Sequence, residues 1–362
     1  MSAVASIRCT CRQSIISATS NATRSRVSAS VLRSHRRSFA STSAPSSVRT
    51  KARLSRPVLA FLGLSLTLPT TYFFFPLSSS SSLSPQIYTN HPVSTTQSLT
   101  SQHKLIAVPI PSSSSSTQYF ERPFRTDGSL ADVEKGEVVV QHMMIKSPDI
   151  QIERPYTPVN DGVRDGEVRM VVKRVRGGEV GRVVHNLQPG DEVGIRGPIP
   201  TFSITPNDYD RIIMISTGTA IAPFLQLLSK LPSPTTPAAT SSSSPSSPTT
   251  TPQLHLIHAS PLPNRIDWTN SNLDPSFIPA LKQKFVDRLQ ISRIEPGPVS
   301  KDVVSNALSG LGKEEKVMVL VCLPPWLMRP LCGGMTPNLG QGPITGVLAE
   351  LGLTNAQVWK LE

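Results

Sequence analysis

The chain has 362 residues, enough for two domains of ordinary size plus a terminal extension, and a formal net charge of +12. All of this excess lies in residues 1–120, which hold 12 Lys and Arg and no acid, whereas residues 121–362 hold 24 basic and 24 acidic residues. A nucleic-acid-binding protein carries its basic surface on the folded part of the chain, which is neutral here. The composition therefore argues against DNA or RNA as a partner.

The first 56 residues are typical of a mitochondrial transit peptide. They are rich in Arg, Ser and Ala and contain no acidic residue. A secretory signal is disfavoured, because no apolar run begins near residue 10. A disordered basic arm is the alternative interpretation of the same composition.

An uncharged apolar stretch follows at 57–77, and no charged residue occurs between Arg56 and Lys104. Its length reaches the ~20 residues that a helix needs to cross a bilayer. Lys51 and Arg53 flank its N-terminal side, so the positive-inside rule predicts that this side stays in the matrix. We therefore predict a protein of the mitochondrial inner membrane whose folded domains face the intermembrane space. A cleaved sorting segment is the alternative, and it leaves the domains in the same compartment.

A polar linker is expected at 78–84, and residues 85–206 have the pattern of a small antiparallel β barrel or sandwich. Short apolar runs alternate with turn residues, and the Ser-rich run 112–116 is interpreted as a loop insertion. The expected strands are Lys104–Ile110, Val138–Ile145, Val168–Val175 and Glu192–Arg196.

Residues 207–362 have the pattern of an α/β domain with a parallel sheet. Continuous apolar runs suited to buried strands alternate with segments of helical spacing. The expected strands are Arg211–Ser216, Leu254–Ala259 and Lys316–Cys322, and the expected helices are Ala220–Leu231, Ala280–Leu289 and Ser300–Leu308. The insertion at 232–252 consists largely of Pro, Ser and Thr, and we expect it to be disordered.

Two segments of the β half have the chemistry of a phosphate-binding site. Arg154-Pro155-Tyr156-Thr157 sets an arginine, which can bind a phosphate with two hydrogen bonds, next to a flat aromatic ring. The turn Gly177-Gly178-Glu179-Val180 precedes a predicted helix, whose first N–H groups suit an anion. Taken singly, each segment also fits an ordinary turn.

Two segments of the α/β half follow predicted strands. They are Thr217-Gly218-Thr219 and Cys322-Leu323-Pro324-Pro325. Ligands of open parallel sheets bind beyond the carboxyl ends of the strands, so both segments are candidate ligand loops. The four cysteines have neither metal-ligand spacing nor a paired framework, and no metal site is predicted.

In this order, the four segments resemble the ferredoxin-reductase-like flavoproteins, and within them the cytochrome b5 reductases, over residues 85–362. The tail Gly342-Pro343-Ile344-Thr345-Gly346 and the predicted mitochondrial leader are similar to fungal mitochondrial flavoproteins that act in cytochrome c import. The resemblance implies an FAD-binding β barrel followed by an NAD(P)-binding α/β domain.

The resemblance also implies roles for individual residues. Arg154 would hold the FAD pyrophosphate, Tyr156 would pack on the flavin side and Thr157 would hydrogen-bond the flavin ring. The backbone of Gly178, Glu179 and Val180 would cradle the phosphates of FAD.

On the nucleotide side, Gly218, Thr219 and Pro324 would contact the nicotinamide nucleotide, and Cys322 would lie near the nicotinamide. Thr157 and Cys322 are the residues expected at the reacting rings. The implied reaction passes electrons from NADH or NADPH through FAD to a haem protein of the cytochrome c or b5 type, with the flavin supplying the redox chemistry.

Several positions depart from the family pattern. Thr217, Ala220 and Leu323 stand where glycines are expected, and each adds bulk near the nucleotide. Glu179 replaces a cationic residue. The alternative function is therefore a non-catalytic or weakly catalytic flavoprotein factor for cytochrome c import or haem attachment.

Overall fold

The structure, a computed structural model, describes residues 82–112, 114–147, 151–233, 251–259, 266–312 and 314–361. All of them belong to one compact unit that begins at Pro76. The predicted transit peptide (1–56), membrane anchor (57–77) and most of the insertion (232–252) lie outside the described residues. Among the residues described, no helix combines the length and apolar character needed to span a membrane.

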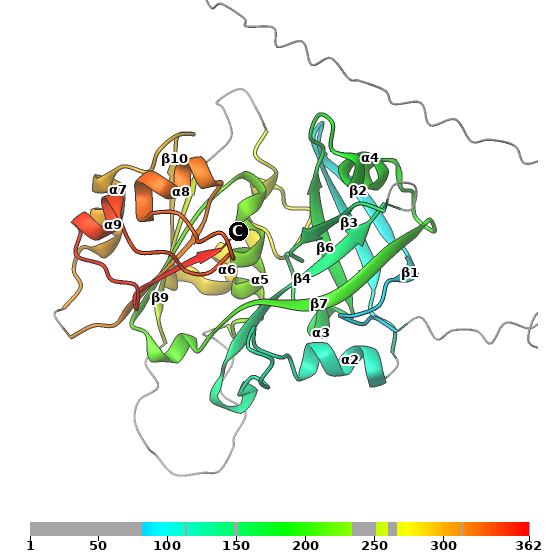
Figure 1. Cartoon of the computed structure of the whole chain (residues 1–362), viewed down its shortest axis with the longest axis horizontal. Coiled ribbons are helices and arrows are strands. Elements are labelled where there is room, and N and C mark those ends of the chain that lie inside the picture. The colour runs from blue at the N-terminus through cyan, green and yellow to red at the C-terminus, as the bar shows by residue number, and fades with distance from the viewer. Residues whose placement is uncertain are drawn as a thin grey trace, which may run out of the picture. The chain divides into compact units, whose positions relative to one another are not determined.

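The first domain consists of two antiparallel sheets around one core, as predicted (Figure 1). One sheet has the order β1-β7-β4-β5, formed by Thr89–Pro92, Glu192–Ile204, Val138–Lys146 and Glu153–Tyr156. The other has the order β2-β3-β6, formed by Thr95–Thr100, His103–Pro109 and Glu167–Lys173. An antiparallel bridge between Pro158 and Met170 joins them. The described part of the domain also contains the short α-helices α2 (Ser114–Glu121), α3 (Gly162–Asp165) and α4 (Glu179–Asn186).

The second domain is a five-stranded parallel sheet, which confirms the predicted α/β fold. Its order is β10-β9-β8-β11-β12, formed by Leu289–Ile294, Gln253–Ala259, Arg211–Thr217, Val317–Cys322 and Val358–Leu361. Its helices are α5 (Ala222–Lys230), α6 (Ile278–Phe285), α7 (Lys301–Leu308), α8 (Pro325–Cys332) and α9 (Gly346–Glu350). A 3₁₀ turn, η3 (Gly218–Ile221), leads from β8 into α5.

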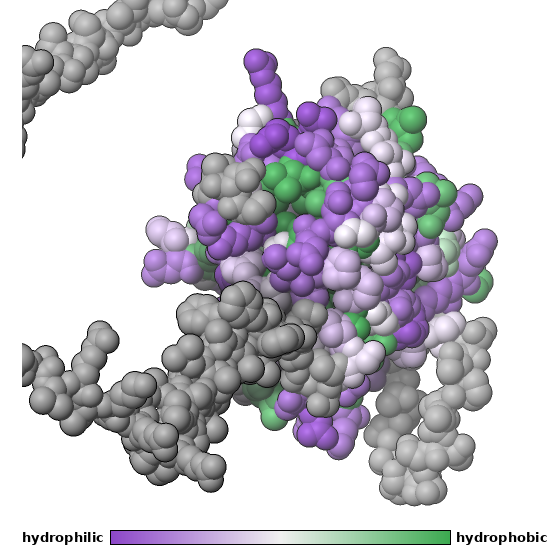
Figure 2. Space-filling model, turned by 90° about the vertical axis from the view of Figure 1, so that its right-hand side faces the viewer, coloured by the Kyte–Doolittle hydropathy of each residue, from purple (hydrophilic) through white to green (hydrophobic). Residues whose placement is uncertain are grey.

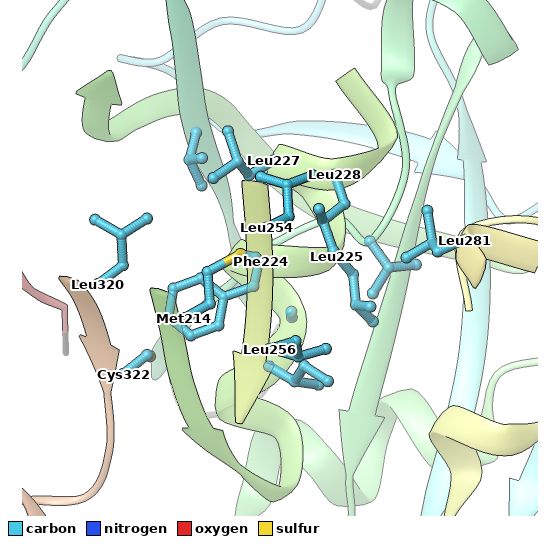
Figure 3. Close-up of a cluster of buried hydrophobic side chains, with 14 of the residues drawn as sticks. Met214, Phe224, Leu225, Leu227, Leu228, Leu254, Leu256, Leu281, Leu320 and Cys322 are labelled. Atoms are coloured by element: carbon cyan, nitrogen blue, oxygen red, sulfur yellow. The ribbon is translucent and has the colours of Figure 1, made fainter. Parts of the chain in front are cut away.

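Alternation along the strands divides the core of this domain in two. Ile212 and Met214 of β8 pack in the same cluster as α5 and α6, whereas Ile213 and Ile215 pack with α7 and α8 on the other face. Figure 3 shows the first cluster, in which Phe224 of α5 lies among side chains of β8, β9 and β11. Nearly all of α5 is buried, so it is fixed firmly against the sheet.

Three expectations of local structure were wrong. The run at 112–116, interpreted as a loop, contains the start of α2. The helix expected over Ala280–Leu289 ends at Phe285, and the edge strand β10 begins at Leu289, because the alternating residues of Leu289–Ile294 pair with β9.

The third expectation concerns the linker at 78–84, which does not extend to its predicted end. Leu83 is fully buried in the β-domain core, and its N–H donates to Ser116 Oγ at 3.0 Å. The folded domain therefore already includes Leu83. The surface seen in Figure 2 is mostly hydrophilic, with small hydrophobic patches between polar side chains.

The burial of Leu83 generates a stability prediction. Leu83→Ala should lower the free energy of unfolding by about 2–5 kcal/mol, because it leaves a cavity in the core. Ile87→Ala is the matched control: Ile87 is 64% exposed, and its truncation should change stability by less than about 0.5 kcal/mol. Denaturant unfolding of the full chain measures both, and equal effects would contradict the assignment of Leu83 to the core.

Candidate flavin and nucleotide cleft

A cleft of about 860 Å³ is lined by residues of both domains. Its β-domain wall comes from β4, β5, β6, β7 and the start of α4. Its α/β wall comes from η3, the start of α5 and the ends of β11 and β12. Of the sequence-predicted site residues, eight line it: Arg154, Tyr156, Thr157, Gly178, Glu179, Val180, Thr219 and Cys322. Gly218 and Pro324 are not part of the lining.

Strand β5 carries the Arg-Pro-Tyr-Thr segment into the cleft. It pairs with β4, and Tyr156 lies opposite Met143. The Arg154 guanidinium is exposed, and it donates to the carbonyl of Glu153 at 2.8 Å. Among the described residues no carboxylate forms an ion pair with Arg154, so its charge is available to an anion. Burial raises the pKa of the half-buried Tyr156, which stays a neutral flat ring.

The glycine turn brings the N-terminus of α4 to the same wall. Gly177 has φ +76°, a conformation that favours glycine, and Gly178 is the N-cap residue of α4. Gly178 has no side chain to accept a hydrogen bond from the first turn of the helix. The N–H groups of that turn therefore lack the usual cap at the point where the helix lines the cleft.

The C-terminus of α4 is held by a lysine of strand β3. The buried Lys104 ammonium donates to the carbonyl of His185 at 3.0 Å and also to that of Leu187. A cation at this end of a helix interacts favourably with the helix dipole. Helix α4 is thereby fixed with its N-terminus toward the cleft.

Glu179 is paired within its own helix. Its carboxylate forms an ion pair with Arg182, so its negative charge is balanced locally. Lys173 also lines the cleft, and no ion pair is found for it among the described residues. Together with Arg154, it gives the wall a positive charge despite Glu179.

The α/β wall is mostly apolar. Thr219, Ala220 and Pro223 line it where η3 leads into α5, and Cys322 lines it at the end of β11. Gly218 has φ +56°, a conformation that favours glycine. It therefore allows the backbone to turn from β8 into η3 and does not itself line the cleft.

Leu323 does not add bulk to the cleft, contrary to the sequence-based expectation. Its side chain is 3% exposed and packs in the cluster on the opposite face of the sheet, with Val321. Adjacent residues of an extended chain point to opposite sides, and Cys322 packs in the other cluster. Ala220, by contrast, does line the cleft.

His142 and Thr201 also line the cleft, although no motif in the sequence singles them out. The Nδ1 atom of His142 lies 2.9 Å from Thr201 Oγ1. Burial, with a smaller effect of the Arg196 charge, lowers the pKa of His142 to about 4, so the imidazole is neutral at pH 7. His142 and Met144 are two residues apart on β4 and share a face, a spacing visible in the sequence once β5 is placed beside β4.

These groups fit a dinucleotide-sized cofactor with a pyrophosphate. An exposed arginine and an uncapped helix start suit the phosphates, and a neutral aromatic ring suits a flat heterocycle. A volume of about 860 Å³ lies within the usual ~300–1,000 Å³ of ligand sites. No cluster of possible metal ligands occurs within the described ranges.

Comparison with known proteins identifies the family. Residues 113–204 match the model of the oxidoreductase FAD-binding domain. The NADH-cytochrome b5 reductase 2 of Meyerozyma guilliermondii is 33% identical over 208 residues, which cover 57% of this chain and 67% of the relative. The enzyme of the same name from Candida glabrata is 29% identical over 247 residues, covering 67% of this chain and 77% of the relative. The chain belongs to the NADH-cytochrome b5 reductase family.

A solved structure supports the fold. The cytochrome b5 reductase domain of Ulva prolifera nitrate reductase has a TM-score of 0.50 and 18% identity, covering 77% of this chain and 99% of that one. The predicted ferredoxin-reductase-like fold is confirmed. Family membership also confirms the predicted class, a flavin-dependent oxidoreductase with FAD as cofactor. The electron donor was predicted as NADH or NADPH, and the family narrows this choice to NADH.

The packing around Gly181 predicts how this reductase binds FAD. A Cβ atom at Gly181 would lie 3.0 Å from the carbonyl oxygen of Lys173, so Gly181→Ser requires the first turn of α4 and the end of β6 to move apart by a few tenths of an ångström. We expect FAD affinity to fall about tenfold, or ~1.4 kcal/mol. Flavin fluorescence on titrating FAD into the apoprotein measures the effect.

Gly312→Ser is the matched control for that substitution. A Cβ atom at Gly312 would meet only the flexible side chain of Glu315, at 3.6 Å, and Gly312 is absent from the cleft lining. FAD affinity should be unchanged. An unchanged affinity in Gly181→Ser would show that the position of α4 does not determine FAD binding.

Proposed function

We propose that the protein transfers electrons from NADH through FAD to a haem protein of the cytochrome b5 or cytochrome c type. The observation that carries this proposal is the shared cleft. It brings Arg154, Tyr156 and Thr157 of the β domain together with Thr219 and Cys322 of the α/β domain. One wall thus suits a flavin and the other suits a nicotinamide, as hydride transfer between two rings requires.

The β-domain residues would hold FAD. Arg154 and the first-turn N–H groups of α4 would bind the pyrophosphate, and the Tyr156 ring would pack on the flat part of the cofactor. Thr157 would donate or accept a hydrogen bond at the flavin edge. When bound, the flavin supplies two-electron chemistry toward NADH and one-electron chemistry toward haem.

The α/β residues would orient NADH against that flavin. Thr219 and the backbone of η3 would contact the nucleotide, and Cys322 would pack at the nicotinamide. The apolar side chains of Pro223 and Leu361 would exclude water from the space between the rings. His142 is neutral, so it adds no charge to the flavin wall.

The haem acceptor is proposed from the names of the relatives, which are NADH-cytochrome b5 reductases. A location in the mitochondrial inner membrane, with the folded domains in the intermembrane space, is proposed from the sequence alone. The Arg-rich segment 1–56 and the apolar stretch 57–77 support it.

A factor for cytochrome c import or haem attachment, with weak or no turnover, is the second candidate. Ala220, which stands where the sequence resemblance implies a glycine, lines the cleft on the wall that NADH would contact. This substitution favours weakened nucleotide binding.

Anaerobic reduction separates the two candidates. The full chain, purified with FAD in detergent, should lose its flavin absorbance when NADH is added, and then reduce cytochrome b5 or cytochrome c. NADPH serves as the matched donor control. A yellow protein that NADH does not reduce would refute the reductase and leave the import factor, whereas failure to bind FAD would refute both.

The proposed location has its own test. In isolated mitochondria, the full chain should resist carbonate extraction, and protease should reach its C-terminal domains only after the outer membrane is ruptured. A known soluble intermembrane-space protein is the control for extraction. Release of the full chain by carbonate would contradict a retained anchor at 57–77.

A further inference from the structure

Two buried glutamines connect the two walls of the cleft. Gln141 lies on β4 in the β domain and Gln226 on α5 in the α/β domain, and each is 3% exposed. The Gln141 N–H donates to Gln226 Oε1 at 2.7 Å, and Gln226 Nε2 donates to the Gln141 carbonyl at 3.0 Å. One side-chain amide thus satisfies both backbone groups of a residue 85 positions away.

Gln141 lies on a part of β4 that β5 does not cover, so its backbone groups are open to a side-chain partner. Strand β5 pairs with β4 only along Met143–Lys146, and the β4–β7 register shifts between Val140 and Gln141. The Gln226 side-chain amide therefore takes the place of a neighbouring strand here. It accepts one hydrogen bond from the Gln141 backbone and donates one to it. Figure 1 shows α5 next to β4.

Each partner is close to residues that line the cleft. His142 directly follows Gln141, and Ala222 lies one helical turn before Gln226 on the same side of α5. A shift of Gln141 relative to Gln226 would therefore move His142 on one wall of the cleft and Ala222 on the other.

Further polar contacts strengthen the connection. Lys230, one turn after Gln226, donates to the carbonyl of Val139 at 2.7 Å. The Gln141 side chain has its own partner, because its Nε2 donates to the carbonyl of Tyr119 at 3.0 Å. Breaking such a buried pair leaves polar groups unsatisfied, so the arrangement is well defined.

We propose that Gln226 is a positioning residue that sets the distance between the flavin wall and the nicotinamide wall, and so the rate of hydride transfer. The inference rests on the proposed function. In the step concerned, the nicotinamide C–H bond breaks, its hydrogen leaves with the electron pair and bonds to the flavin. NADH becomes NAD⁺ and FAD gains two electrons. Because the reacting atoms must approach to about 3–3.5 Å, a shift of about 1 Å between the walls costs about a hundredfold in rate.

The test compares Gln226→Leu with Ser229→Ala in the full chain. Ser229 is also buried on α5, but its hydroxyl donates only within the helix, to the carbonyl of Gln226 at 2.8 Å. Hydrogen exchange of the apoprotein is the first readout. The peptide containing the Gln141 amide should exchange faster in Gln226→Leu than in the wild type, and at the wild-type rate in Ser229→Ala.

Stopped-flow reduction of bound FAD by NADH is the second readout. Gln226→Leu should slow it about tenfold to a hundredfold, with FAD affinity unchanged because the phosphate wall is intact. Gln226→Glu keeps an acceptor for the Gln141 N–H but sets a carboxylate oxygen against the Gln141 carbonyl, so it should also slow the reduction. If Gln226→Leu does not fold, Gln226→Glu against Ser229→Ala decides the question.

Two results would overturn the proposal. Faster exchange at Gln141 with a wild-type reduction rate would show that the contact does not position the rings, and unchanged exchange would show that Gln226 does not hold β4. If the wild type itself is not reduced by NADH, the proposed function fails. The exchange readout then still reports on the connection between the domains.

Discussion

Strand β4 is the element on which both walls of the cleft depend. Along its length it pairs with β7, and at Met143–Lys146 it also pairs with β5, which carries Arg154 and Tyr156. At Gln141 it accepts and donates the hydrogen bonds of Gln226 from α5. Strand β4 thus positions both β5, which would bind FAD, and α5, which follows the nucleotide loop. A shift of β4 would move both walls of the cleft.

The electrostatics of the cleft depend on which charges are already balanced. Glu179 is paired with Arg182, and His142 is neutral because burial lowers its pKa to about 4. Arg154 and the uncapped start of α4 keep their attraction for an anion. The wall is therefore selective for a phosphate without a large excess of basic residues, in agreement with the neutral charge balance of residues 121–362.

The sequence was sufficient for the order of the two domains and for most strands, because the buried runs of β8, β9 and β11 are continuous and apolar. The start of α2 was missed because its serines have the composition of a loop. Strand β10 was missed because its polar residues lie on a sheet edge and only pairing with β9 orders them. Leu323 was misjudged because the side to which it points depends on the position of β11 in the sheet. His142 and Gln226 could not be assigned from motifs, since their partners are far away in the sequence.

The contribution of Leu361 to the cleft has a consequence for the order of assembly. Every β-domain residue of the lining precedes the end of β7 at Ile204, whereas the α/β wall is complete only when β12 has paired with β11. During synthesis, which proceeds from the N-terminus, all residues of the phosphate wall are therefore present before the opposite wall is complete. During that interval the flavin wall is open to solvent on the face that the second domain later covers. A bulky cofactor can then reach its binding site from this face.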